Sequence, residues 1–95
     1  MNHYELTVIV RNRETESHKE KVKEVLQKHG AVITKEDHWG IKKLAYEISK
    51  EREGYYMFML VDAASEAVDK IQKELGLNAD ILRYLFVRPA DIKTA

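Results

Sequence analysis

The sequence has no cysteine, and this absence excludes disulfides, cysteine nucleophiles and metal sites built on thiolates. It also lacks an excess of charge of either sign, because 16 Lys and Arg residues balance 16 Asp and Glu residues. No overall electrostatic field therefore directs the protein toward phosphate groups or membranes. A polyanionic partner would have to bind a local basic patch, or be bound with help from a second, more basic protein.

Long apolar runs are missing as well. The longest one, residues 55–61, is far too short to span a bilayer. Residues 1–6 contain no basic segment followed by an apolar run, so we expect no signal peptide, no membrane contact and a cytoplasmic location. With one proline, four glycines and 44% hydrophobic residues, the composition is typical of a folded chain, and we expect a single domain over residues 1–95.

Motifs that carry chemistry are scarce too. The four histidines have no spacing that would bring two of them together on one element as metal ligands. The four glycines stand alone, so there is no Gly-rich phosphate loop, and nothing resembles a nucleophile with its base. We therefore expect no catalytic residue, no metal, no cofactor and no small-molecule substrate.

What the sequence does contain is apolar periodicity that changes type along the chain. Residues 4–10 alternate between apolar and other side chains, which predicts a strand with one apolar face. Residues 17–20, Ser-His-Lys-Glu, match a capping box, and a helix is expected to begin there. Gly30 lies where a left-handed C-cap would end this helix.

A long extended segment follows at residues 31–48. Trp39-Gly40 is expected to form a bend or bulge within it, because glycine inside a strand often marks one. Residues 49–54 are polar and predict a turn. Residues 55–61 are apolar at every position, which indicates a strand that is covered on both faces.

A second helix and a last strand complete the pattern. Asp62 or Ser65 is expected to cap the helix, and Gly76 to close it. The strand is expected over residues 81–87, ended by Pro89. The order β-α-β-β-α-β predicts an α+β, ferredoxin-like fold, in which two helices cover one face of a four-stranded antiparallel sheet.

The face of the sheet without helices is the informative surface. If Tyr4, Leu6, Val8 and Val10 face the helices, Ile9 points to the bare face. One alternating set of residues 55–61 must do the same, either Tyr56, Phe58 and Leu60 or Tyr55, Met57, Met59 and Val61. Leu44 and Tyr46 lie nearby. An exposed apolar patch of this kind indicates an interface, so we expect a partner to cover it.

Aromatic residues also stand beside basic ones. Tyr46 follows Lys42 and Lys43, and Tyr84 lies between Arg83 and Arg88. Rings stack on bases and Lys or Arg holds phosphates, so the combination suits RNA. Aromatic residues in strands are more often part of a core, and the signature of RNA-recognition modules is absent. The residues alone thus leave RNA contact open.

The apolar face fits other proteins equally well. A ferredoxin-like regulatory domain could pair two such faces in a homodimer and hold a small ligand. A small dimeric isomerase or oxygenase would need convergent polar groups between the sheet and the helices, and the inward-facing residues offer only Tyr4 and His29.

Several strings resemble the bacterial small-subunit ribosomal protein S6 family. They are Tyr4-Glu5, the segment Gly-Ile-Lys-Lys-Leu-Ala-Tyr-Glu-Ile at residues 40–48, Gly54-Tyr55-Tyr56 and Ile81-Leu82-Arg83-Tyr84. The resemblance implies a ferredoxin-like, non-enzymatic protein of the small ribosomal subunit. It also implies a monomer when isolated, which binds the central domain of 16S rRNA as a pair with ribosomal protein S18.

The resemblance and the bare face together supply the candidate site residues. Asn2 and His3 stand where some family members have arginine, and the tail after Pro89 has no acidic run, so C-terminal glutamylation is not expected. The candidates for RNA binding are His3, Tyr4, Lys42, Lys43, Arg83 and Arg88. The candidates for partner binding are Ile9, Leu44, Tyr46, Tyr56, Phe58 and Leu60.

Overall fold

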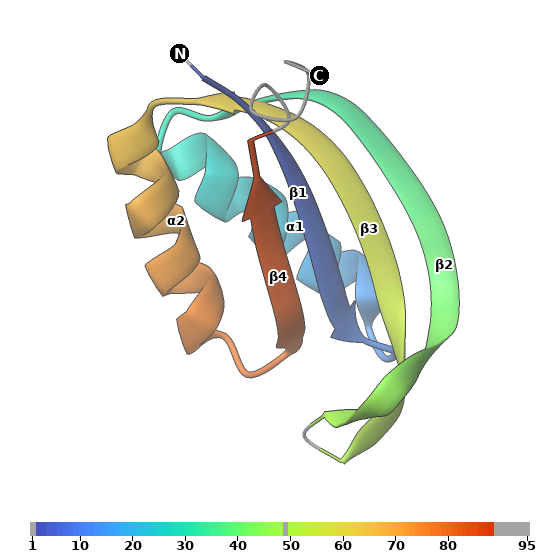
Figure 1. The fold of residues 1–95 in the computed structure, drawn as a ribbon. Helices are drawn as coiled ribbons and strands as arrows, with labels where there is room; N and C mark the ends of the chain where they lie inside the picture. Colours follow the sequence, from blue (N-terminus) through green and yellow to red (C-terminus); the bar gives the residue numbers. More distant parts are fainter. Residues whose placement is uncertain (1, 49, 89–95) are drawn as a thin grey trace.

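The computed structural model describes residues 2–48 and 50–88, which form four strands and two helices. The strands are antiparallel neighbours in the order β2-β3-β1-β4, and both helices cover the same face of the sheet (Figure 1). This confirms the predicted ferredoxin-like fold. The elements are β1 (Asn2–Arg11), α1 (Thr15–Lys28), β2 (Val32–Ile48), β3 (Glu51–Ala63), α2 (Ser65–Leu77) and β4 (Ile81–Val87).

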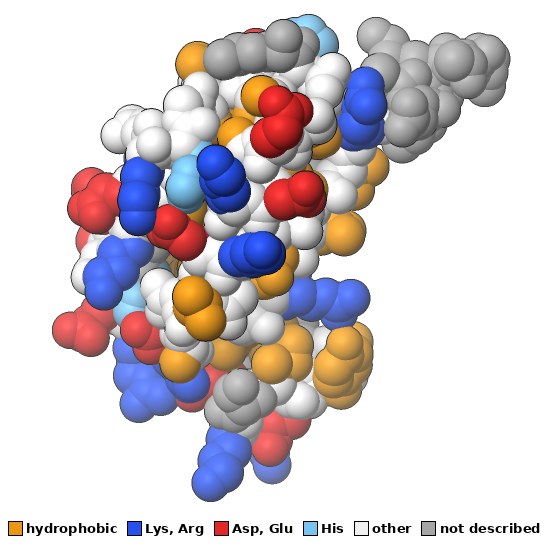
Figure 2. Space-filling view, turned by 90° about the vertical axis from the view of Figure 1, so that its left-hand side faces the viewer, with side chains coloured by type: hydrophobic (Ala, Val, Ile, Leu, Met, Phe, Trp, Pro, Cys, Tyr) orange, Lys and Arg blue, Asp and Glu red, His pale blue; other side chains and the backbone are white. Residues whose placement is uncertain are grey.

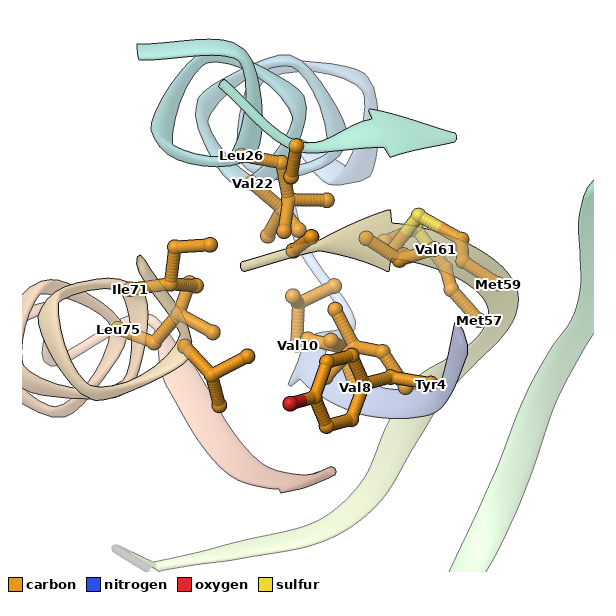
Figure 3. Packing of buried hydrophobic residues seen from close by; sticks show 14 residues of the cluster. Tyr4, Val8, Val10, Val22, Leu26, Met57, Met59, Val61, Ile71 and Leu75 are labelled. Carbon is orange, nitrogen blue, oxygen red and sulfur yellow. The ribbon is translucent and has the colours of Figure 1, made fainter. Parts of the chain in front are cut away.

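The core lies between the sheet and the two helices (Figure 3). The predicted alternation in β1 is confirmed, because its even-numbered residues from Tyr4 to Val10 are buried against α1 and α2. The structure also shows which of the two alternating sets of side chains in β3 faces the helices. Met57, Met59 and Val61 are buried among the helices, so Tyr56, Phe58 and Leu60 point to the open face.

Helix α1 begins earlier than predicted, so the expected capping box at residues 17–20 is wrong. Its N-cap is Glu14, in a left-handed conformation with φ of 51° and without a side-chain cap. The His18 N–H donates to the carbonyl of Glu14, so Ser17 lies within the first helical turn instead of capping it. The predicted end is confirmed, because Gly30 has φ of 78° and its N–H donates to the carbonyl of Gln27.

The expected caps of α2 are also wrong. Asp62 lies within β3, and the Ser65 hydroxyl binds the Glu66 carboxylate instead of capping the helix, whose N-cap is Ala64. Gly76 lies inside the last turn rather than after it. A Cβ on Gly76 would lie only 3.1 Å from the Tyr84 hydroxyl, so this glycine allows β4 to approach α2 closely.

The β2–β3 hairpin is longer than the sequence indicated. Residues 51–54 belong to β3, not to a turn, because Glu51, Glu53 and Gly54 still pair with residues of β2. The predicted bulge at Trp39-Gly40 is confirmed by a register shift between His38 and Gly40 and by φ of 83° at Gly40. Ser49 and Pro89 lie outside the described residues.

Candidate interface on the open sheet face

The face opposite the helices brings together residues from all four strands. Arg83 and Leu85 of β4 pair with Ile9 and Thr7 of β1, which pair in turn with Tyr56 and Phe58 of β3. Because paired residues point to the same side of a sheet, these side chains share the open face. A shallow hollow there is lined by Thr7, Ile9, Tyr56, Arg83, Tyr84 and Leu85.

Aromatic rings stack beside this hollow. The ring of Trp39 lies parallel to that of Phe58, with the ring centroids 5.6 Å apart, and the Lys42 ammonium lies 5.5 Å from the centroid of Trp39. Trp39 is 47% exposed. The bulge at Gly40 shifts the register so that Trp39 reaches Phe58. Trp39 was not among the sequence candidates, although a lone tryptophan beside a strand glycine was a usable signal.

The two neighbouring lysines point to opposite sides of β2. Lys42 pairs with Gly54 on the open face, whereas Lys43 pairs with Glu53. Lys43 and the half-buried Leu44 line a separate cleft beside the hairpin, together with Asn12 and Glu47. The structure therefore does not bring Lys43 and Leu44 together with the other candidates.

Arg83 and Tyr46 meet although they come from the two opposite edges of the sheet. Nη1 of Arg83 donates a hydrogen bond of 2.9 Å to the Tyr46 hydroxyl. The β2–β3 hairpin curls beneath the end of the sheet toward β4, which makes this contact possible (Figure 1). Both side chains remain exposed, and Tyr46 is 61% accessible.

A second group of candidates lies at the other end of the sheet, around Tyr4. Tyr4 is only 6% exposed, its ring packs edge-on against Phe86, and the guanidinium of Arg88 lies 6.0 Å from the centroid of its ring. His3 is exposed and contacts the Asp62 carboxylate. Tyr4 thus belongs to the core, while His3 and Arg88 stay at the surface.

The apolar candidates differ in how much they expose. Ile9 points to the open face but is only 7% exposed, and Gly54 of the neighbouring strand β3 lies close against its side chain. Tyr56, Phe58 and Leu60 are half-buried, and Leu85, which was not a candidate, is 55% exposed. The exposed apolar side chains around the half-buried residues of β3 therefore include Trp39, Tyr46 and Leu85.

Two glutamates whose pKa values are lowered by ion pairs lie on the helix side of the molecule. The hydrogen bond from Lys23 lowers the pKa of Glu36, and that from Lys28 lowers the pKa of Glu74. These contacts tie α1 to β2 and to α2. On the side drawn in Figure 2, acidic and basic side chains are interspersed, so no continuous basic surface forms there.

The described residues offer little for other chemistry. Within residues 2–48 and 50–88, no three His, Asp or Glu side chains come together in a way that could hold a metal ion. In the same part of the chain, no helix is long and apolar enough to cross a membrane.

Comparisons with known proteins all lead to one family. Residues 3–88 match the sequence model of the family described as ribosomal protein S6. The chain is 36% identical to the small ribosomal subunit protein bS6 of Gluconacetobacter diazotrophicus, over 97% of this chain and 60% of that protein. It is 33% identical to the bS6 protein of Caulobacter sp. strain K31, over 97% of this chain and 76% of that protein.

A solved structure has the same fold. The 30S ribosomal protein S6 of Thermotoga maritima superposes with a TM-score of 0.86 at 24% sequence identity, over 98% of this chain and 92% of that one. In length, the chain spans about 60% of the first two curated relatives that it matches.

Proposed function

The chain belongs to the ribosomal protein S6 family, and we propose from this that it is a structural, non-enzymatic component of the small ribosomal subunit in the cytoplasm. In the proposed complex it binds the central domain of 16S rRNA together with ribosomal protein S18. The observation that supports this proposal most directly is the open sheet face, where exposed aromatic rings lie beside basic side chains.

A protein partner explains the apolar part of this face. Trp39 and Leu85 are about half exposed, and they border the half-buried Tyr56 and Phe58. Exposing an apolar patch of this kind to water costs free energy, and a docked partner removes this cost by covering the patch. We therefore assign S18 to the patch formed by Trp39, Tyr56, Phe58, Leu60 and Leu85, and the nearly buried Ile9 points to the same face.

RNA explains the basic side chains around the patch. Lys42 and Arg83 lie on the open face, and Arg88 and His3 lie at its far end. Among the described residues, no carboxylate forms an ion pair with Lys42, Arg83 or Arg88, so each retains its charge for a phosphate group. Because the whole chain has a formal net charge of zero, a basic partner would supply further neutralisation.

The same apolar face supports one rival, a homodimer that buries it against a second copy. Sedimentation of the isolated protein distinguishes the homodimer from the ribosomal role with S18. We expect a monomer alone and a one-to-one complex after addition of S18, whereas a stable homodimer that excludes S18 would favour the rival.

The proposal is tested by fractionating a cell lysate on a density gradient and probing for this chain in free protein, small subunits, large subunits and whole ribosomes. We expect the chain to sediment with small subunits, and to remain with them through a high-salt wash. A chain found only in the free fraction, as a homodimer, would overturn the ribosomal role.

A further inference from the structure

The β2–β3 hairpin carries Tyr46 across the end of the sheet to Arg83. These residues belong to the two edge strands, and β3 and β1 lie between them. The hairpin is held in place by Glu51, whose carboxylate accepts hydrogen bonds of 2.7 Å from Arg11 and 2.9 Å from Arg13. The contact between the Tyr46 hydroxyl and Arg83 is therefore supported by a separate anchor in the same hairpin.

Three arginines around the hairpin, Arg11, Arg13 and Arg83, differ in their partners. Arg11 pairs with Glu51 and Asp80, and Arg13 pairs with Glu51, so acidic groups compensate both charges. Within the described part of the chain, the Arg83 guanidinium forms no ion pair, and its one side-chain hydrogen bond is to the neutral hydroxyl of Tyr46. A guanidinium has five N–H donors, and the hydrogen bond to Tyr46 uses one of them. Arg83 thus keeps its charge and most of its donors while its side chain is held.

We propose that Tyr46 is a positioning residue, which holds the Arg83 guanidinium in the orientation that binds an RNA phosphate. This inference rests on the RNA-binding role of Arg83 in the proposed function. Tyr46 accordingly acts through its hydroxyl as well as through its ring. Arginine binds phosphate with two parallel hydrogen bonds, so the direction of its planar group matters and fixing it beforehand favours binding.

The inference predicts a specific pattern in RNA binding. Tyr46→Phe keeps the ring and removes only the hydroxyl, so the loss of one hydrogen bond should weaken binding about three- to tenfold. The salt dependence should stay the same, because the arginine still neutralises its phosphate. Arg83→Gln should weaken binding and also reduce the slope of log K against log salt by about one phosphate contact, or roughly 0.7–0.9.

The experiment measures binding of the chain with purified S18 to a transcript of the 16S rRNA central domain, at several salt concentrations. It compares wild type, Tyr46→Phe, Arg83→Gln and the double variant. Tyr55→Phe is the matched control, because it removes a hydroxyl from a ring on the helix side of the sheet, where the Lys19 ammonium of α1 lies 4.7 Å from the ring centroid. We expect the double variant to equal Arg83→Gln and the control to equal wild type.

A second measurement needs no RNA. In the isolated chain, nuclear magnetic relaxation of the Arg83 Nε–H group should show a more mobile side chain in Tyr46→Phe than in wild type. Unchanged mobility, or unchanged affinity in Tyr46→Phe while Arg83→Gln binds weakly, would overturn the positioning role alone. If Arg83→Gln binds as well as wild type, the RNA role of Arg83 fails, and the positioning role fails with it.

Discussion

Gly54 in β3 packs directly onto the side chain of Ile9 in β1, and a Cβ at Gly54 would clash with Cγ2 of Ile9. The absence of a side chain at this glycine therefore leaves room for the Ile9 side chain beside β3. We expect Gly54→Ala to lower the free energy of unfolding by about 1–3 kcal/mol, the usual cost of overpacking. Chemical denaturation measures this loss. In an Ile9→Ala background the cost should shrink, and an equal cost in both backgrounds would refute the clash.

Two helical leucines offer a comparison of buried and exposed positions. Leu26 in α1 is fully buried, whereas Leu77 at the end of α2 is 86% exposed. Leu26→Ala should lower the free energy of unfolding by about 2–5 kcal/mol, because it leaves a cavity between α1 and the sheet. Leu77→Ala should change it by no more than about 0.5 kcal/mol. Similar losses in the two variants would contradict the described core.

The two lysines of β2 should differ in their effect on RNA binding, because they lie on opposite sides of the strand. With S18 and the central-domain transcript, Lys42→Ala should weaken binding and reduce the salt slope by about 0.7–0.9. Lys43→Ala should leave the slope unchanged, and the double variant should match Lys42→Ala. If the double variant changes neither affinity nor slope, the basic patch has been assigned to the wrong residues.

Trp39 is the only tryptophan and lies on the proposed docking surface, so its fluorescence can report on docking. Acrylamide should quench it readily in the isolated chain, where it is 47% exposed, and much less after S18 is added. Trp39→Ala should also weaken the complex with S18, because aromatic anchors contribute much of the energy of an interface. Unchanged quenching in a complex that has demonstrably formed would place the partner on another surface.

The ion pair between Lys23 of α1 and Glu36 of β2 should make the free energy of unfolding depend on pH. The hydrogen bond from Lys23 holds the pKa of Glu36 below its ordinary value of 4.5, so the folded state binds protons less readily there than the unfolded chain does. The resulting stabilisation is fully present above about pH 4.5 and is lost as pH falls through the lowered pKa. At neutral pH, Glu36→Gln should cost less than about 1 kcal/mol, since the pair is partly exposed.

The measurement for this pair is urea denaturation across the acidic range. The difference between wild type and Glu36→Gln should shrink as pH falls below 4.5. Glu20→Gln serves as the control, because Glu20 is an exposed glutamate on α1, the helix that carries Lys23, without an ion-pair partner among the described residues. If the difference in the free energy of unfolding between wild type and Glu36→Gln stays constant with pH, the carboxylate of Glu36 is not the source of the pH dependence.

Periodicity in the sequence was sufficient to predict the order of elements, because strands and helices bury side chains at different intervals. It could not tell which face of β3 is open, since Tyr56 and Phe58 are as apolar as Met57 and Met59. That choice depends on how β3 pairs with β1, whose alternation is clear. Gly30 and the bulge at Gly40 were predictable because positive φ favours glycine at both positions.

Other features depend on contacts between distant parts of the chain, which local patterns do not contain. The start of α1 follows from a left-handed Glu14 rather than from a capping side chain. The meeting of Tyr46 with Arg83 requires the curvature of the whole hairpin. Likewise, Lys42 and Lys43 look like one basic patch in the sequence, and only their pairing partners in β3 separate them.

The order of strands leaves β2, the longest strand at 17 residues, on an edge of the sheet. A long regular edge would be a template on which other copies could add strands and aggregate. Three shifts in the register of β2 twist and interrupt this edge, and exposed lysines such as Lys35 lie along it. The same irregularity that places Trp39 beside Phe58 thus makes this edge a poor template for the strands of other copies.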